Sequence, residues 1–329
     1  MDHIGATVLS ALVAAVLAGA TTVSLKSRIG LQRAVTVAVL GATTIAGLGV
    51  AWSFGLVTIQ IPLLLAGAFL LGLLATKSQF SSSYRAMAIG IAVVAIAMSA
   101  SGSALPVFAA YWINAVVTVV LFVPLVLMLM NLEGAPNTQV SITPIMVTGA
   151  ALIGLQRGEH SLGLVALAAG GACVGIAAWH WLGHSRRVGP APSIFLAVVA
   201  IGAGTGFDGK IGWSVLAIGI GLLVIPVTDL FVVIEGRRRQ GNLRWGHGTD
   251  HLYFRLRAHG LTSRGASAVI LAAASAGVTS SCLTAGEFIP WPIGLCIAWA
   301  LKLGLTFWAL RSPDPGGLEQ SLRPHGSRP

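Results

Sequence analysis

Long apolar stretches alternate with short polar loops along almost the whole chain. A membrane-spanning helix needs about 20 mostly apolar residues, and about eleven stretches approach this length. They cover residues 4–25, 34–54, 61–76, 86–104, 106–130, 144–155, 162–182, 193–206, 213–234, 266–283 and 291–310. The first stretch lacks a preceding basic region and is followed by many others, so we interpret it as a retained helix. The pattern predicts an all-α, polytopic integral membrane protein with about eleven transmembrane helices.

Composition agrees with this pattern. Of the 329 residues 55% are hydrophobic and only 9% are charged, whereas soluble domains carry roughly 25% charged residues. These values exclude a soluble globular enzyme and a disordered chain. Residues 1–310 are therefore predicted to form a single transmembrane helical domain. The Pro-, Gly- and Ser-rich residues 311–329 are predicted to form a disordered cytoplasmic tail.

The basic residues predict the orientation of the chain. The formal net charge is +10, and most of the 20 Lys and Arg fall in alternate loops and in the tail. Cytoplasmic loops of membrane proteins carry such an excess, so the N-terminus is predicted outside and the C-terminus in the cytoplasm. The excess is thereby explained by topology, and no nucleic-acid partner is expected.

The largest polar loop, residues 235–265, holds seven of the arginines, three of the eight histidines and Asp250. Its first basic cluster, Arg237, Arg238 and Arg239, is typical of a loop that contacts anionic lipid headgroups. In its second half, the spacing of Leu252 and Leu256 predicts a short amphipathic helix on the membrane face. Arginine and histidine side chains there suit recognition of a nucleotide or pyrophosphate.

This loop and the apolar stretch before it resemble the C-terminal signature of a known family. The signature reads P-x-x-D-T on a helix, then an arginine-rich exit and D-H-L-H-H-R-L followed by G-L-S-x-R. The matching residues are Pro226, Asp229, Asp250, His251, Leu252, Arg255, Leu256, Gly260, Leu261 and Arg264. The chain is similar in this region to the polyprenyl-phosphate N-acetylhexosamine-1-phosphate transferases, the bacterial MraY- and WecA-type enzymes (glycosyltransferase family 4). The resemblance implies ten or eleven spans in the bacterial cytoplasmic membrane.

The resemblance also implies an active site, which this chain matches poorly. Family members transfer a phospho-sugar from a UDP-sugar to polyprenyl phosphate, using Mg²⁺ held by cytoplasmic aspartates. Ala75 and Thr76 stand at the first aspartate pair, and Pro190 stands at a third-motif aspartate. Glu133 is a possible remnant of the second motif. Tyr253 and Phe254 replace two histidines of the last motif. Because Mg²⁺ takes hard oxygen ligands, we interpret the chain as a catalytically degenerate member with no cofactor.

Asp229 is predicted to lie within a span, where a carboxylate is costly and needs a partner or a cavity. Two interpretations stay open, a surviving residue of a binding cleft and a structural hydrogen bond to a neighbouring helix or arginine. With Asp250, His251 and Arg255, it forms the candidate set for binding a phosphate or nucleotide sugar.

Three functions follow as hypotheses. The first is a non-catalytic binder or regulator in peptidoglycan or other cell-wall glycan synthesis, whose partners are membrane lipids, polyprenyl phosphate, a nucleotide sugar or a cell-envelope membrane protein. The second is an active UDP-N-acetylhexosamine:polyprenyl-phosphate transferase that holds Mg²⁺ through Glu133, Asp229 and Asp250. The third is a transporter of a lipid-linked glycan that uses Lys302 and Asp229.

Overall fold

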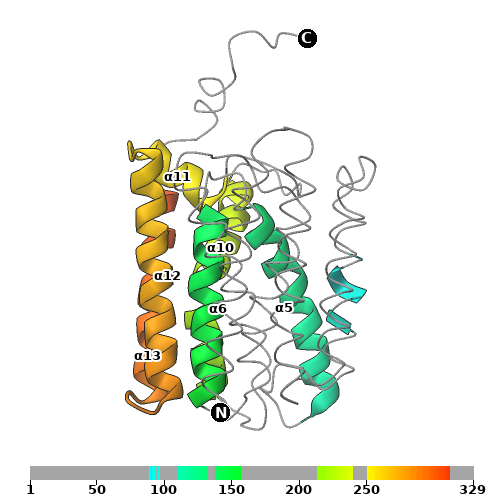
Figure 1. The fold of residues 1–329 in the computed structure, drawn as a ribbon. Helices are drawn as coiled ribbons and strands as arrows, with labels where there is room; N and C mark the ends of the chain where they lie inside the picture. Colours follow the sequence, from blue (N-terminus) through cyan, green and yellow to red (C-terminus); the bar gives the residue numbers. More distant parts are fainter. Residues whose placement is uncertain are drawn as a thin grey trace, which may run out of the picture.

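The structure, a computed structural model, describes residues 89, 91–93, 95–96, 110–131, 138–156, 213–239 and 250–311. Every regular element in these ranges is a helix, which confirms the all-α prediction for this part of the chain (Figure 1). The helices are α5 (Tyr111–Asn131), α6 (Thr138–Gln156), α9 (Trp213–Leu222), α10 (Val224–Arg239), α11 (Leu252–Ala258), α12 (Ser263–Ala285) and α13 (Trp291–Leu310).

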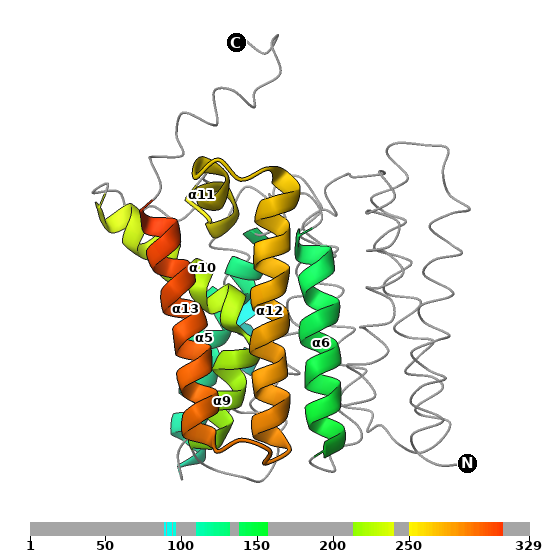
Figure 2. The same cartoon turned by 90° about the vertical axis from the view of Figure 1, so that its left-hand side faces the viewer.

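Helices α12 and α13 form an antiparallel hairpin (Figure 2). Both are long and apolar enough to cross a membrane, and α9 with α10 forms a third candidate span if the pair is counted as one. Helices α5 and α6 overlap the predicted stretches 106–130 and 144–155 and contain shorter apolar segments. The stretches at 4–25, 34–54, 61–76, 162–182 and 193–206 lie outside the described residues, so the total of about eleven spans stays a prediction.

The predicted span at 213–234 is broken in the structure, because the chain bends by 77° between α9 and α10. The break falls at Leu223, and Pro226 is the third residue of α10. Proline has no backbone N–H, so the carbonyl of Leu222 loses the donor that would continue the helix, and bends of this kind concentrate at proline. Val227 resumes the helical pattern with a 3.0 Å bond from its N–H to the carbonyl of Leu223. Both halves contact α13, and after the bend α10 also contacts α11.

Helix α12 packs closely against α6 and α9 through small residues. A Cβ atom added at Gly277 would meet the backbone carbonyl of Gly221, and one added at Gly149 would meet Val278. The hydroxyl of Ser281 donates to the carbonyl of Ile218 across the α9–α12 contact at 2.8 Å. Small residues of this kind let membrane helices approach closely enough for extensive van der Waals contact. They fix the position of α12, from which α11 and α13 are placed.

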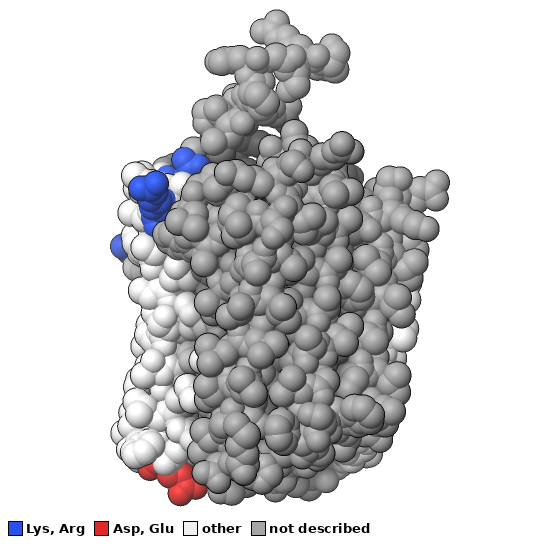
Figure 3. Space-filling view, in the orientation of Figure 1, with Lys and Arg blue, Asp and Glu red and all other residues white. Residues whose placement is uncertain are grey.

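Charge is concentrated at the two ends of the hairpin. Arg264 lies at the start of α12 and Arg311 directly follows α13, whereas Glu287 lies in the turn between the two helices. Figure 3 shows the basic side chains at one end of the described surface and the acidic ones at the other, with uncharged side chains between them. We call the first the arginine-rich end. It also holds α11 and the last turn of α10 (Figures 1 and 2).

Candidate functional site

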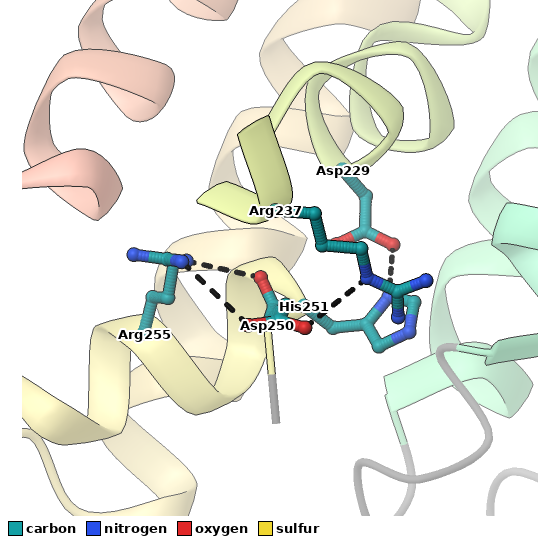
Figure 4. A network of polar contacts seen from close by, with 5 residues as sticks. All are labelled: Asp229, Arg237, Asp250, His251 and Arg255. Carbon is teal, nitrogen blue, oxygen red and sulfur yellow. Dashed lines mark hydrogen bonds and ion pairs between the residues drawn. The ribbon is translucent and has the colours of Figure 1, made fainter. Parts of the chain in front are cut away.

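Five polar side chains from α10 and the start of α11 meet at the arginine-rich end (Figure 4). These residues, which we call the polar cluster, are Asp229, Arg237, Asp250, His251 and Arg255. Asp229 is 0% exposed, His251 3%, Arg255 6% and Arg237 8%, and only Asp250 is partly exposed. Charged residues are rarely buried unless they are paired. The contacts within the polar cluster therefore decide how it is stabilised and what it can bind.

Asp229 uses both of its carboxylate oxygens inside the protein. Oδ1 accepts a hydrogen bond from the backbone N–H of Leu252 at 2.6 Å, and Oδ2 lies 2.8 Å from Nδ1 of His251. Leu252 is the first residue of α11, whose own N-cap residue, His251, provides no side-chain cap. A carboxylate at a helix N-terminus satisfies a free N–H group and complements the helix dipole. Asp229 on α10 thus caps α11 and orients the ring of His251.

Asp250 bridges the two buried arginines. Oδ2 lies 3.2 Å from Nε of Arg237, and Oδ1 lies 3.8 Å from Nη2 of Arg255. The Nε of Arg255 also donates to the backbone carbonyl of Asp250 at 3.0 Å. The guanidinium of Arg255 reaches this position across α10 at Gly236, where an added Cβ atom would meet Nη2. Glycine at 236 therefore makes room for Arg255.

His251 presents one unused nitrogen. Its Nε2 atom is buried and has no hydrogen-bond partner, while Nδ1 contacts Asp229. A neutral ring that donates from Nδ1 keeps a lone pair on Nε2, and a protonated ring donates from both nitrogens. A buried polar atom without a partner costs free energy, so Nε2 is the atom in the polar cluster best placed to bind a ligand.

The structure brings together all four residues of the predicted binding set, Asp229, Asp250, His251 and Arg255. Glu133, Ala75, Thr76 and Pro190, which concern the predicted loss of the magnesium site, lie outside the described residues. Within the ranges that the structure does describe, no group of three or more His, Cys, Asp or Glu could hold a metal ion.

Arg237 and Gly236 belong to the site although the sequence did not single them out for it. The prediction that Arg237 contacts lipid headgroups with its two neighbours is wrong, because its side chain is buried against Asp250. Arg238 and Arg239 are exposed and pair with Glu235 at 2.7 and 2.9 Å. Arg237 lies eight residues after Asp229, which places both on one face of α10. This spacing is the sequence feature from which a role of Arg237 in the site could have been predicted.

The apolar side of α11 faces the protein, not the membrane as predicted. Leu252 and Leu256 are fully buried, and α11 packs against α10, α12 and α13. Tyr253 is also buried, and its hydroxyl lies 2.7 Å from Oγ of Ser263 at the start of α12. This hydroxyl therefore joins α11 to α12, although its position in the motif suggested a role in the site.

Replacing Tyr253 with phenylalanine is expected to lower the free energy of unfolding by about 1 kcal/mol, because a buried hydroxyl pair is lost. Thermal unfolding of the purified protein in detergent measures the change. Ser263→Ala should cost a similar amount, and the double variant should cost little more than either single variant. Fully additive effects would show that the two hydroxyls do not interact.

No family model matches the chain. Its sequence is similar to that of the Streptomyces coelicolor protein named "Putative glycosyltransferase SCO3672", with 31% identity over 182 residues. The match covers 52% of this chain and 42% of that protein, so the chain spans less than half the length of its relative. The chain is thus a helical, glycosyltransferase-like protein with candidate membrane spans.

Proposed function

We propose that the chain is a multi-pass protein of the bacterial cytoplasmic membrane that serves cell-envelope glycan synthesis by binding a phosphorylated ligand. The ligand is a polyprenyl phosphate or a nucleotide sugar, bound without transfer of the sugar phosphate. The resemblance to the MraY and WecA enzymes supports this ligand class, and the name of the Streptomyces relative supports a role in glycan synthesis.

The observation that carries the proposal is the unpartnered Nε2 atom of His251 within the polar cluster. Two arginines lie in the same cluster, and arginine and protonated histidine are suitable donors to phosphate oxygens. Asp229 holds the imidazole ring from its other side, at a distance of 2.8 Å. The ring is therefore already oriented before a ligand binds, which lowers the ordering cost of binding.

The contacts of the two aspartates favour binding without catalysis. Both oxygens of Asp229 and both oxygens of Asp250 face donors of the protein. Mg²⁺ needs carboxylate oxygens in near-octahedral geometry, so metal binding there would require these contacts to break. Ala75, Thr76 and Pro190, which the resemblance places at aspartate positions, offer no carboxylate. No cofactor is part of the proposal.

The arginine-rich end supports a cytoplasmic location for the polar cluster. Basic residues mark the cytoplasmic side of membrane proteins, and Arg264 and Arg311 both lie at this end of the α12–α13 hairpin. This orientation, with about eleven spans and the N-terminus outside, would place the site in the compartment that supplies nucleotide sugars. A cell-envelope membrane protein is the partner that such a binder would serve.

Binding and turnover are tested on the purified full chain. Polyprenyl phosphate, UDP-GlcNAc and UDP-MurNAc-pentapeptide are titrated separately, and UMP release is followed with both substrates and Mg²⁺ present. We expect saturable binding of one ligand and no Mg²⁺-dependent release of UMP. His251→Ala should weaken binding by about tenfold or more, the value of one hydrogen bond to a charged group.

His259→Gln is the matched control, because His259 is at the other end of α11 and contacts the carbonyl of Trp308 instead of the cluster. The affinity of this variant for the ligand should stay within about twofold of that of the wild type. Equal losses in both variants would indicate a general effect on α11. Absence of binding to all three ligands would overturn the proposal. Mg²⁺-dependent UMP release that Glu133→Gln or Asp250→Asn abolishes would establish the transferase instead.

A further inference from the structure

Lys302 lies near the middle of α13 with its ammonium group against two aromatic rings. Its Nζ atom is 3.4 Å from the ring centre of Phe231 on α10 and 4.3 Å from that of Trp299. The side chain is 4% exposed. Among the residues that the structure describes, no acidic side chain forms an ion pair with it.

A cation at this depth needs compensation. Charged residues within membrane spans are costly and pair with another charge or with backbone carbonyls. The two rings attract the ammonium group through their quadrupoles, but they carry no net charge, so the charge of Lys302 stays uncompensated by the chain's described part. The acids of α10 do not compensate it, since both oxygens of Asp229 contact His251 and Leu252 and Glu235 pairs with Arg238 and Arg239.

A second polar group lies beside Lys302. Thr306 follows it by one helical turn, and its Oγ1 atom is buried without a hydrogen-bond partner. Residues four apart in a helix are neighbours on one face. Polar groups on this face of α13 suit a partner that carries an anionic group, such as a carboxylate.

The rings beside Lys302 belong to the outer surface of the protein. Phe231 is 47% exposed and Trp299 is 39% exposed. Further large apolar side chains are exposed along α13, namely Ile297, Leu303 and Phe307. A group that reaches Lys302 therefore comes from the lipid side of α10 and α13, after a rotation of one ring.

The depth of Lys302 in the membrane distinguishes between the anionic groups that could pair with it. Lys302 is eleven residues from Trp291 and eight from Leu310, or about 16 and 12 Å at the helical rise. Helical side chains point towards the N-terminus of their helix, and the contact with Trp299 agrees with that direction. Lipid phosphates lie outside a hydrocarbon core about 30 Å thick, so they are too far from the middle of α13. A carboxylate on another transmembrane helix lies at the required depth.

We propose that the α10–α13 face around Lys302 docks a transmembrane helix of a partner protein that carries Asp or Glu near the middle of its span. The carboxylate pairs with the ammonium group of Lys302, and the exposed rings contact the apolar part of the helix. A second copy of this chain is a poorer occupant, because the acids of its described candidate spans are already paired, Asp229 with His251 and Glu235 with Arg238 and Arg239. The proposal does not depend on the ligand of the polar cluster.

The test uses the full chain in lipid vesicles and synthetic transmembrane peptides of leucine with one central residue. Association is measured by energy transfer between labels on the chain and on the peptide. A central-Glu peptide should associate about tenfold more tightly than a central-Leu peptide, because the intramembrane charge gains its partner. A peptide with Glu moved two turns towards its end should lose most of this preference.

Variants of the chain identify the partner group. Lys302→Met should abolish the preference for Glu, whereas Lys302→Arg should retain it. Arg311→Met is the matched control, because it removes one positive charge that lies over an aromatic ring at the end of the same helix, and the preference should remain. Equal association of the Glu and Leu peptides with the wild type would overturn the proposal. So would a preference for Glu that persists in Lys302→Met.

Discussion

Replacing Asp229 with alanine is expected to lower the free energy of unfolding by about 2–6 kcal/mol, since each of two buried groups left without a partner costs roughly 1–3 kcal/mol. The carboxylate is 0% exposed and serves two groups, the N–H of Leu252 and Nδ1 of His251. Alanine leaves both groups buried without a partner, and water cannot replace the carboxylate at full burial. Denaturant or thermal unfolding in detergent micelles measures the loss.

Hydrogen exchange locates the same effect along the chain. The backbone amides at the start of α11 should exchange faster in Asp229→Ala, whereas amides at the contact of α12 with α6 should change little. Asp229→Asn should cost less than the alanine variant, because an amide oxygen still accepts from the N–H of Leu252. If the alanine variant stays within about 1 kcal/mol of the wild type, Asp229 does not cap α11.

Replacing Gly277 with alanine is expected to cost about 1–3 kcal/mol or more, the range for overpacking a close contact. The added Cβ atom would meet the backbone carbonyl of Gly221 and would lie 2.7 Å from Cγ1 of Val224. A backbone atom cannot turn aside as a flexible side chain can, so α9 and α12 must separate. The temperature at which the purified protein loses its monodisperse elution peak measures this loss.

Gly304 on α13 provides the matched control, because an added Cβ atom there would meet nothing within 4 Å. Gly304→Ala should be neutral or should stabilise the protein by roughly 0.5–1 kcal/mol, since alanine loses less backbone entropy in a helix. A similar loss of stability in both variants would indicate that the substitutions act by impairing membrane insertion. A neutral Gly277→Ala would mean that the two helices are not in close contact.

The sequence predicts α13 to the residue, and α12 within a few residues at each end. These two helices are mostly apolar over a membrane-spanning length and end at polar turns, so hydropathy alone defines them. The bend between α9 and α10 was not predicted, although Pro226 was in view. Proline is tolerated in membrane helices where neighbouring groups satisfy the freed carbonyl. A proline in the sequence therefore does not by itself predict that a span bends.

Four of the five members of the polar cluster were predicted, but their contacts were not. The resemblance singled out Asp229, Asp250, His251 and Arg255, which do lie together. It could not assign His251 to Asp229 and Arg237 to Asp250, because these pairs depend on how α11 is placed against α10. The face that α11 buries was wrongly predicted for the same reason. Leu252 and Leu256 define an apolar side equally well for a membrane and for a neighbouring helix.

The capping of α11 by a residue of α10 has a consequence for the connection between them. Asp229 binds Leu252, and Arg237 binds Asp250, so the two ends of residues 240–249 are held together from outside that segment. Lengthening a connection whose ends are already joined costs little, about 0.6 kcal/mol for each doubling of its length. Insertions or a fused domain at this point should therefore leave the arrangement of the polar cluster unchanged. The geometry of the site and the length of its loop are free to evolve separately.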